Sequence, residues 1–235
     1  MNTTVGGTDA YDAGAMRARY RRILRFASRF LVQTWWFELV LPRIGLTRIA
    51  VRTRGRRMKR FARAFHGLAV DLGGLMIKVG QFMSSRLDVL PPEITKELEC
   101  LQDEVPPVPF AQIRAAAEAE LGIPLDRAFS WFDQTPVAAA SLGQAHRARL
   151  STIDAGVTGL DGVVVKVQRP GIQQIVDVDL AALRKVGGWL SRIRLVYTLV
   201  NAPALVEEFA ATSLAEIDDF HAAVQSERVP RACEH

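Results

Sequence analysis

The chain has 235 residues, 49% of them hydrophobic, and its net charge is +5. This composition supports a packed core and excludes a chain that is disordered throughout. The two cysteines, Cys100 and Cys233, are too few for a disulfide framework or a cysteine zinc site. The four histidines show no metal-ligand spacing, so we predict no metal site.

The first segments of the chain carry most of its positive charge. Residues 1–15 are small and polar and are predicted to be a disordered leader, without the apolar stretch of a secretory signal. Residues 16–67 are predicted to form a basic, aromatic and amphipathic helical arm that Pro42 interrupts. Residues 1–67 together hold fourteen arginines and one lysine against three acidic residues, whereas the remainder is net acidic. A basic arm on an acidic body predicts an anionic partner.

The arm's mixture of arginine, tryptophan and phenylalanine is typical of helices that lie in a membrane interface. We therefore expect residues 16–67 to contact an anionic membrane surface, with packing of the arm on the rest of the protein as the alternative. We do not expect nucleic acid as a partner, because no helix-turn-helix, zinc or RNA-binding motif accompanies the charge. The sequence has no uncharged apolar stretch of about eighteen residues, so we predict no transmembrane helix and expect a cytoplasmic protein peripheral to the membrane.

Residues 68–128 are predicted to be a helical extension, with helices over 66–87, 93–103 and 110–121. Within it, Lys78 and Gln81 are three residues apart and share a helix face. Glycines and a lysine inside an apolar helix are locally unfavourable, and such violations are typical of functional sites. A surface lysine beside a glycine-mediated helix crossing is the alternative.

Residues 129–235 are predicted to contain a small antiparallel sheet and two further helices. The expected elements are a strand over 129–132, a hairpin formed by 136–150 and 162–168, and helices over 172–193 and 203–227. The β-branched run before Lys166 places this lysine on a buried strand, where an ammonium group needs an anionic partner. A strand lysine that reaches solvent is the alternative.

Several motifs occur in a fixed order along the chain and carry a family resemblance. They are Lys78-Val79-Gly80-Gln81, Leu101-Gln102-Asp103-Glu104-Val105-Pro106-Pro107, the alanine-rich loop Ala138-Ala139-Ala140-Ser141, Val165-Lys166-Val167-Gln168-Arg169-Pro170-Gly171-Ile172, and Glu216-Ile217-Asp218. In this order they resemble the AarF/UbiB/ADCK family of atypical kinase-like proteins.

The resemblance implies an α+β, mostly helical fold: an N-terminal helical extension, then the small antiparallel sheet and helices of a protein-kinase-like N-lobe over residues 129–235, with the C-lobe absent. It implies that ATP or ADP binds with Mg²⁺ at five residues: Ala138, Ala139, Ala140, Ser141 and Lys166. It also implies a regulatory site in which Lys78 pairs with Glu216 or Asp218 and Gln81 lies in the same pocket.

Two departures from the family pattern affect the expected activity. Ala222 stands where the family has the glutamate that pairs the nucleotide lysine, and no catalytic-loop or metal-binding motif of a phosphotransferase follows. We therefore assign no catalytic residue and expect a chain that is catalytically incomplete.

The family supports biosynthesis of isoprenoid quinones of the ubiquinone type, or of related lipids, at membranes. We expect the same role here, with a full-length relative or a quinone-pathway enzyme as a further partner. The alternatives are a non-catalytic, membrane-associated regulatory or binding module and a truncated gene remnant.

Overall fold

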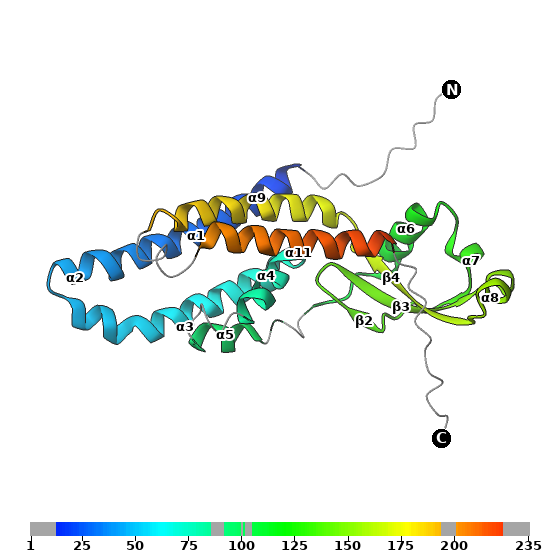
Figure 1. The fold of residues 1–235 in the computed structure, drawn as a ribbon, viewed down its shortest axis with the longest axis horizontal. Coiled ribbons are helices and arrows are strands. Elements are labelled where there is room, and N and C mark those ends of the chain that lie inside the picture. The colour runs from blue at the N-terminus through cyan, green and yellow to red at the C-terminus, as the bar shows by residue number, and fades with distance from the viewer. Residues whose placement is uncertain (1–12, 86–91, 100, 102–104, 194–200, 223–235) are drawn as a thin grey trace, which may run out of the picture. The chain divides into compact units, whose positions relative to one another are not determined.

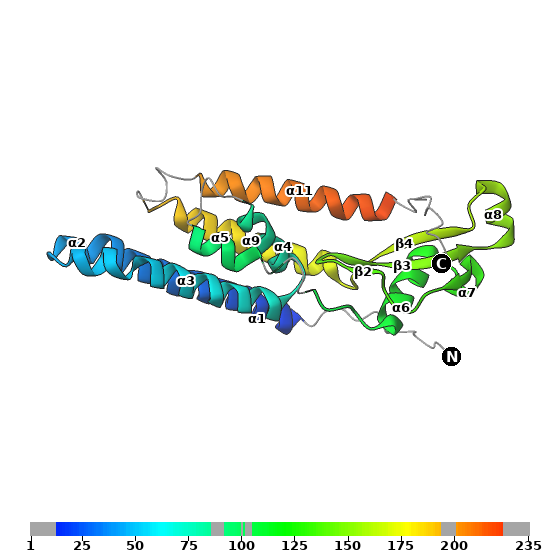
Figure 2. The same cartoon turned by 90° about the horizontal axis from the view of Figure 1, so that it is seen from below.

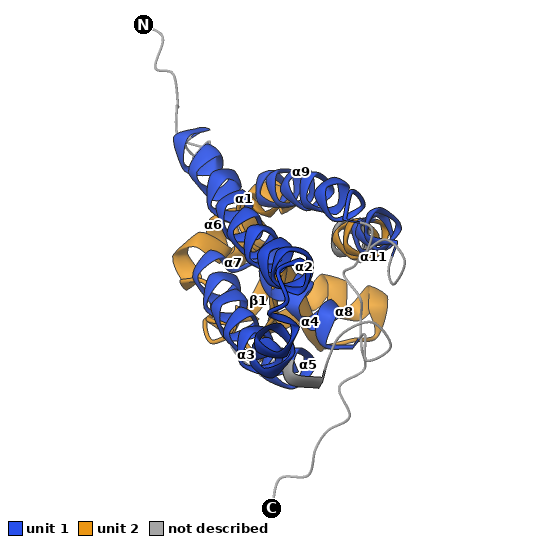
Figure 3. Cartoon of the chain, turned by 90° about the vertical axis from the view of Figure 1, so that its left-hand side faces the viewer, with its two compact units in different colours: residues 1–103, 173–210 blue, residues 104–172, 211–235 orange. Residues whose placement is uncertain are grey.

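The structure is a computed structural model that describes residues 13–85, 92–99, 101, 105–193 and 201–222 (Figure 1). The chain divides into two compact units, coloured separately in Figure 3. Unit 1 comprises residues 1–103 and 173–210, and unit 2 comprises residues 104–172 and 211–235. Most of the expected leader lies outside the described residues, and the first described residue, Ala13, already begins a helix.

Unit 1 opens with a long helical hairpin. Its first arm is α1 (Ala13–Trp35), continued by a π-helical turn (Trp36–Val40) and by the short α2 (Leu41–Arg43). Its second arm is α3 (Thr47–Leu72), which lies beside α1 in both side views (Figures 1 and 2). Phenylalanines join the two arms, with the Phe30 and Phe61 rings 3.9 Å apart. The phenylalanines in the middle of the hairpin therefore pack on one another.

A double-glycine break separates α3 from α4 (Leu75–Ser84). Gly73 and Gly74 have φ angles of 63° and 55°, a region that side chains disfavour. The prediction of one helix over 66–87 is therefore wrong, because these two glycines redirect the chain. After α4, α5 (Pro92–Glu99) packs against both α3 and α4.

Two long helices each contribute residues to both units. α9 (Ile172–Leu190) belongs to unit 1 from residue 173, and α11 (Ala202–Ala222) belongs to it as far as residue 210. Within unit 1, Val206 approaches Gly187 so closely that a Cβ there would lie 3.3 Å from it, and Arg184 pairs with Glu207. Close packing and an exposed ion pair thus join these two helices.

Unit 2 is built on a four-stranded antiparallel sheet preceded by α6 (Phe110–Leu121) and α7 (Leu125–Ala128). β3 (Gly143–Leu150) is central and pairs along its length with β4 (Gly162–Gln168). On its other edge, β3 pairs with β1 (Phe129–Phe132) and with β2 (Ala138–Ala139). A short helix, α8 (Thr152–Thr158), lies between β3 and β4, in the connection of the predicted hairpin, for which no helix was predicted. The Ser151 side chain caps it by accepting from the Asp154 N–H.

One face of the sheet is buried against α6. Val163 and Val167 of β4 and Ala148 of β3 point into a core that also contains Ile113 and Phe129. Because side chains alternate along a strand, the residues between them lie on the opposite face.

The predicted fold class, mostly helical with a small antiparallel sheet after N-terminal helices, is confirmed. Among the described helices, none is long and apolar enough to cross a bilayer.

Candidate functional site

The face of the sheet away from α6 carries a row of residues that the sequence singled out. Ala138 of β2 pairs with Ala145 of β3, and Ala145 pairs with Lys166 of β4. Directly paired side chains on one face of an antiparallel sheet are about 5 Å apart at Cβ. Ala138 of the alanine-rich loop and Lys166 therefore lie on the same surface, with Ala145 of β3 between them.

Lys166 is exposed on this face, and the prediction that it is buried is wrong. The β-branched run reads as continuously apolar, but only alternate valines, such as Val163 and Val167, point into the core. Lys166 lies on the opposite face, as do Arg147 and Arg149 of β3, which are also exposed. The face consequently presents three cationic side chains.

The turn between β2 and β3 forms without any left-handed residue. Ala140 N–H donates to the Gly143 carbonyl at 2.8 Å, and no residue from 138 to 143 has a positive φ. Alanine therefore fits this turn without backbone strain, and it leaves the turn stiffer than glycine would. Ala138 and Ala140 are exposed, whereas Ser141 is buried, so a ligand on the open face meets the two alanines first.

Arg169, just after β4, holds this turn in place. Its Nε donates to the Ala140 carbonyl at 3.1 Å, and its Nη2 donates to the Pro106 carbonyl at 2.7 Å. Its backbone N–H donates to the Leu142 carbonyl at 3.0 Å. The residue thus ties the turn to both β4 and the proline-rich connector. The sequence pattern indicated Arg169 only as part of the strand motif, without a role of its own.

The C-terminal half of α11 meets the same end of β4. Gln168 Nε2 donates to the Ile217 carbonyl at 2.8 Å, which brings the Glu216-Ile217-Asp218 segment beside the lysine strand. Glu216 is partly buried, and the side chain of Asp218 lies outside the described residues, as does that of Ala222. Lys78 belongs to unit 1 and Glu216 to unit 2, so their pairing stays a prediction.

The Lys-x-Gly-Gln motif lies on α4 in unit 1. Burial lowers the pKa of Lys78 below its ordinary value near 10.5. Gln81 Nε2 donates to the Leu101 carbonyl at 3.4 Å. Gly80 packs against the Leu101 side chain and Phe65, and a Cβ at Gly80 would overlap the Leu101 Cδ1 atom. The glycine of the motif therefore allows close packing against these neighbours, while the role of Lys78 stays a prediction.

A buried ion pair, which sequence analysis missed, stabilises the start of α4. Arg19 binds Asp179 through two hydrogen bonds of 2.6 Å and also donates to the carbonyls of Leu72 and Gly73. The Asp179 side chain is fully buried, and burial raises its pKa while Arg19 opposes that rise. The pair joins α1 and α9 to the glycine break. No sequence signal indicates it, because its partners are 160 residues apart.

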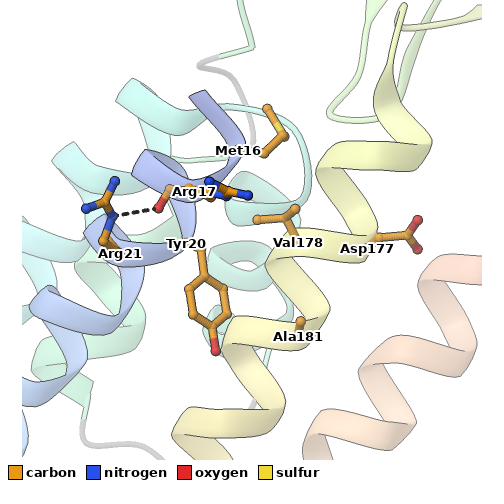
Figure 4. A pocket seen from close by; sticks show the side chains of 7 residues that line it. All are labelled: Met16, Arg17, Tyr20, Arg21, Asp177, Val178 and Ala181. Atoms are coloured by element: carbon orange, nitrogen blue, oxygen red, sulfur yellow. Dashed lines mark hydrogen bonds between the residues drawn. The ribbon is translucent and has the colours of Figure 1, made fainter. Parts of the chain in front are cut away.

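A pocket of about 490 Å³ lies between α1 and α9 in unit 1 (Figure 4). Its lining residues are Met16, Arg17, Tyr20, Arg21, Asp177, Val178 and Ala181. The pocket is open, and Arg21 Nε donates across one helical turn to the Arg17 carbonyl. Because nothing polar and buried points into it, we assign it no ligand.

Comparison with known proteins bears on the chain's family. The sequence model of the ABC1 atypical kinase-like domain matches residues 100–235. The chain is 35% identical over 231 residues to Protein ACTIVITY OF BC1 COMPLEX KINASE 8, chloroplastic, from Arabidopsis thaliana, covering 97% of this chain and 29% of that protein. It is 35% identical over 187 residues to Probable protein kinase UbiB from Xanthomonas campestris, covering 78% of this chain and 32% of that protein. The chain thus spans about a third of the length of these relatives.

A solved structure that is similar to part of the chain comes from Mycobacterium tuberculosis. The complex of Rv3197 with erythromycin from Mycobacterium tuberculosis matches 66% of this chain and 37% of that one, with 28% identity and a TM-score of 0.38.

Proposed function

Because the chain belongs to the ABC1 atypical kinase-like family, we propose that unit 2 binds the phosphates of an adenine nucleotide on the sheet face that carries Lys166. The row of Ala138, Ala145 and Lys166 is the observation that carries the proposal. An exposed ammonium group beside a tight, accessible turn offers a charge and backbone N–H groups to phosphate oxygens. The small side chains of the row leave room for a flat base next to them.

ATP or ADP is the proposed ligand, and Mg²⁺ enters with it as the counter-ion of its phosphates. We assign Mg²⁺ no ligand from this chain. Lys166 would hold the phosphates, and Arg169 would keep the turn that faces them in position. The proposal concerns binding and orientation, and it assigns no step of phosphoryl transfer to these residues.

The wider role in the proposal is support of isoprenoid quinone or related lipid biosynthesis at a membrane, with a full-length relative or a pathway enzyme as partner. It rests on the family resemblance. A non-catalytic regulatory module that uses the nucleotide only as a ligand is consistent with the same face. We also retain Lys78, Gln81, Glu216 and Asp218 as the proposed regulatory site.

Thermal unfolding of the purified chain with ADP or ATP, with and without Mg²⁺, tests nucleotide binding. A ligand at a hundred times its dissociation constant stabilises the folded state by about 2.7 kcal/mol. We expect this stabilisation to be lost in Lys166→Met. Arg149→Met is the matched control, because Arg149 lies on the same face but pairs with Gly162 at the far end of β4.

Three results would contradict the proposal. The first is cooperative unfolding with a melting temperature that nucleotide does not change. That result would favour a module that binds some other partner. The second is an equal loss of stabilisation in Lys166→Met and Arg149→Met, which would indicate non-specific attraction to the basic face. The third is the absence of any cooperative transition, which would favour a gene remnant.

A further inference from the structure

Exposed apolar side chains gather at one end of the helical hairpin of unit 1. We call residues 32–52 the hairpin tip; it includes the end of α1, the π-helical turn, α2 and the start of α3 (Figures 1 and 2). Seven large apolar side chains here are between 42% and 68% exposed: Val32, Trp35, Trp36, Ile44, Leu46, Ile49 and Val51. A cluster of this kind marks an interaction surface, whereas single exposed apolar residues do not.

The rest of the same hairpin buries its apolar side chains. The rings of Phe26 and Phe30 of α1 contact the Phe61 ring of α3 in tilted geometry, and Phe65 is only 5% exposed. The phenylalanines in the middle of residues 16–67 therefore offer little apolar surface to a membrane, and the predicted membrane contact of this segment stays a prediction. The apolar surface left for a partner is the tip.

The exposed charged side chains of the tip are all basic. Arg43, Arg48 and Arg52 are exposed, and Arg54 and Arg56 follow on α3. The one acidic residue between 32 and 56 is Glu38, which is partly buried and is paired with Arg57 at 3.0 Å. Tryptophan combined with arginine suits the boundary between acyl chains and anionic headgroups.

Contacts of Arg57, on α3 just beyond the tip, join its two sides. Arg57 lies over the Phe37 ring, 4.0 Å from its centroid, and donates to both Glu38 and the Ala50 carbonyl. These contacts fasten the π-helical turn of the first arm to the second arm. A preorganised surface loses less entropy on binding than a mobile one.

We propose that the hairpin tip inserts end-on into the interface of an anionic membrane. Its apolar side chains enter the boundary of the acyl chains, and its exposed arginines contact the headgroups. On the α3 side of the tip, the segment from Leu46 to Val51 rises along the helix by about 8 Å, which is within the depth of about 5–10 Å reached by interfacial segments. This inference does not depend on nucleotide binding in unit 2.

Vesicle co-sedimentation of the full chain tests the insertion, using phosphatidylcholine vesicles with and without phosphatidylglycerol. We expect binding that needs the anionic lipid and weakens with salt. Trp35→Ser/Trp36→Ser should reduce the partition coefficient by about tenfold or more. The matched control is Ile153→Ser/Val157→Ser, which changes two side chains of α8 that are 79% and 83% exposed.

Tryptophan fluorescence adds a second readout, which reports the depth of the tip in the bound protein and not the affinity. Brominated acyl chains should quench the tryptophan emission of the bound chain, and Trp35→Phe/Trp36→Phe should bind but lose this quenching. Trp131 and Trp189 lie outside the tip and provide the remaining signal. Equal vesicle binding by the tip and α8 variants would overturn the proposal. So would a tip-dependent dimer in light scattering with no vesicle binding, which would identify a second copy as the occupant.

Discussion

Arg169 donates its Nε hydrogen to the Ala140 carbonyl at 3.1 Å, while its backbone N–H donates to the Leu142 carbonyl at 3.0 Å. Arg169, which follows the lysine strand, therefore fixes two positions of the turn that precedes β3. The same guanidinium reaches the Pro106 carbonyl, so the connector before α6 is fixed by the same side chain. Movement of the connector would consequently shift the Arg169 side chain and, through it, the turn.

Replacement of Arg169 should reduce the stabilisation by nucleotide more than it reduces the stability of the free protein. Arg169→Gln removes two partly solvated hydrogen bonds, for which we expect a loss of about 1 kcal/mol in the free energy of unfolding. If the turn faces the phosphates, the nucleotide-dependent rise in the melting temperature should fall by a larger fraction than the melting temperature itself. Thermal scans with and without ADP measure both. An unchanged nucleotide effect would show that the turn is positioned without Arg169.

Substitution of Gly80 in the Lys-x-Gly-Gln motif should destabilise unit 1. A methyl group at Gly80 would overlap Leu101, which is fully buried and cannot move aside freely. We expect Gly80→Ala to cost about 1–3 kcal/mol in urea unfolding. Gly67→Ala is the control, because Gly67 lies within α3 with open space around its Cα and should gain about 1 kcal/mol. Leu101→Val should partly rescue Gly80→Ala; a loss without rescue would place the strain elsewhere.

The sequence was most informative where local signals and tertiary structure agree. The strands over 129–132 and 162–168 lie where β-branched and aromatic residues meet turn residues, and α6 ends at Gly122 as its sequence predicts. Family motifs also located the alanine-rich segment and the lysine strand, which both pair with β3 in unit 2.

The sequence failed where the outcome depends on register or on distant partners. The exposure of Lys166 follows from which valines face α6, and a continuous β-branched run does not reveal this. The Gly73–Gly74 break was masked by apolar residues on both sides that continue the helical pattern. The helix α8 had a signal, a serine three residues before an aspartate, but the glycines around it favoured a loop.

Removal of Arg19 should destabilise the chain more than neutralisation of Asp179. Arg19→Met leaves a carboxylate that is fully buried and unpaired, which costs about 3–5 kcal/mol. In Asp179→Asn, Arg19 keeps the carbonyls of Leu72 and Gly73 as acceptors, so the loss should be smaller. The double variant Arg19→Met/Asp179→Asn should be more stable than Arg19→Met alone. Additive losses in urea unfolding would show that the two side chains do not act as a pair.

The ionisation of Asp179 should make stability depend on pH in a defined direction. Burial raises its pKa in the folded protein above the ordinary value near 3.8, so the folded chain holds this proton where the unfolded chain has released it. The free energy of unfolding should therefore fall as pH rises from the ordinary pKa to the raised one, and level off above it.

The measurement is urea unfolding of the wild-type chain and of Asp179→Asn over a pH series, because the difference between them isolates this carboxyl group. That difference should decrease with pH across the window. In an Arg19→Met background the window should extend to higher pH, since the guanidinium that opposes the rise in pKa is gone. A difference that grows with pH would mean that the attraction of Arg19 outweighs burial in the folded protein.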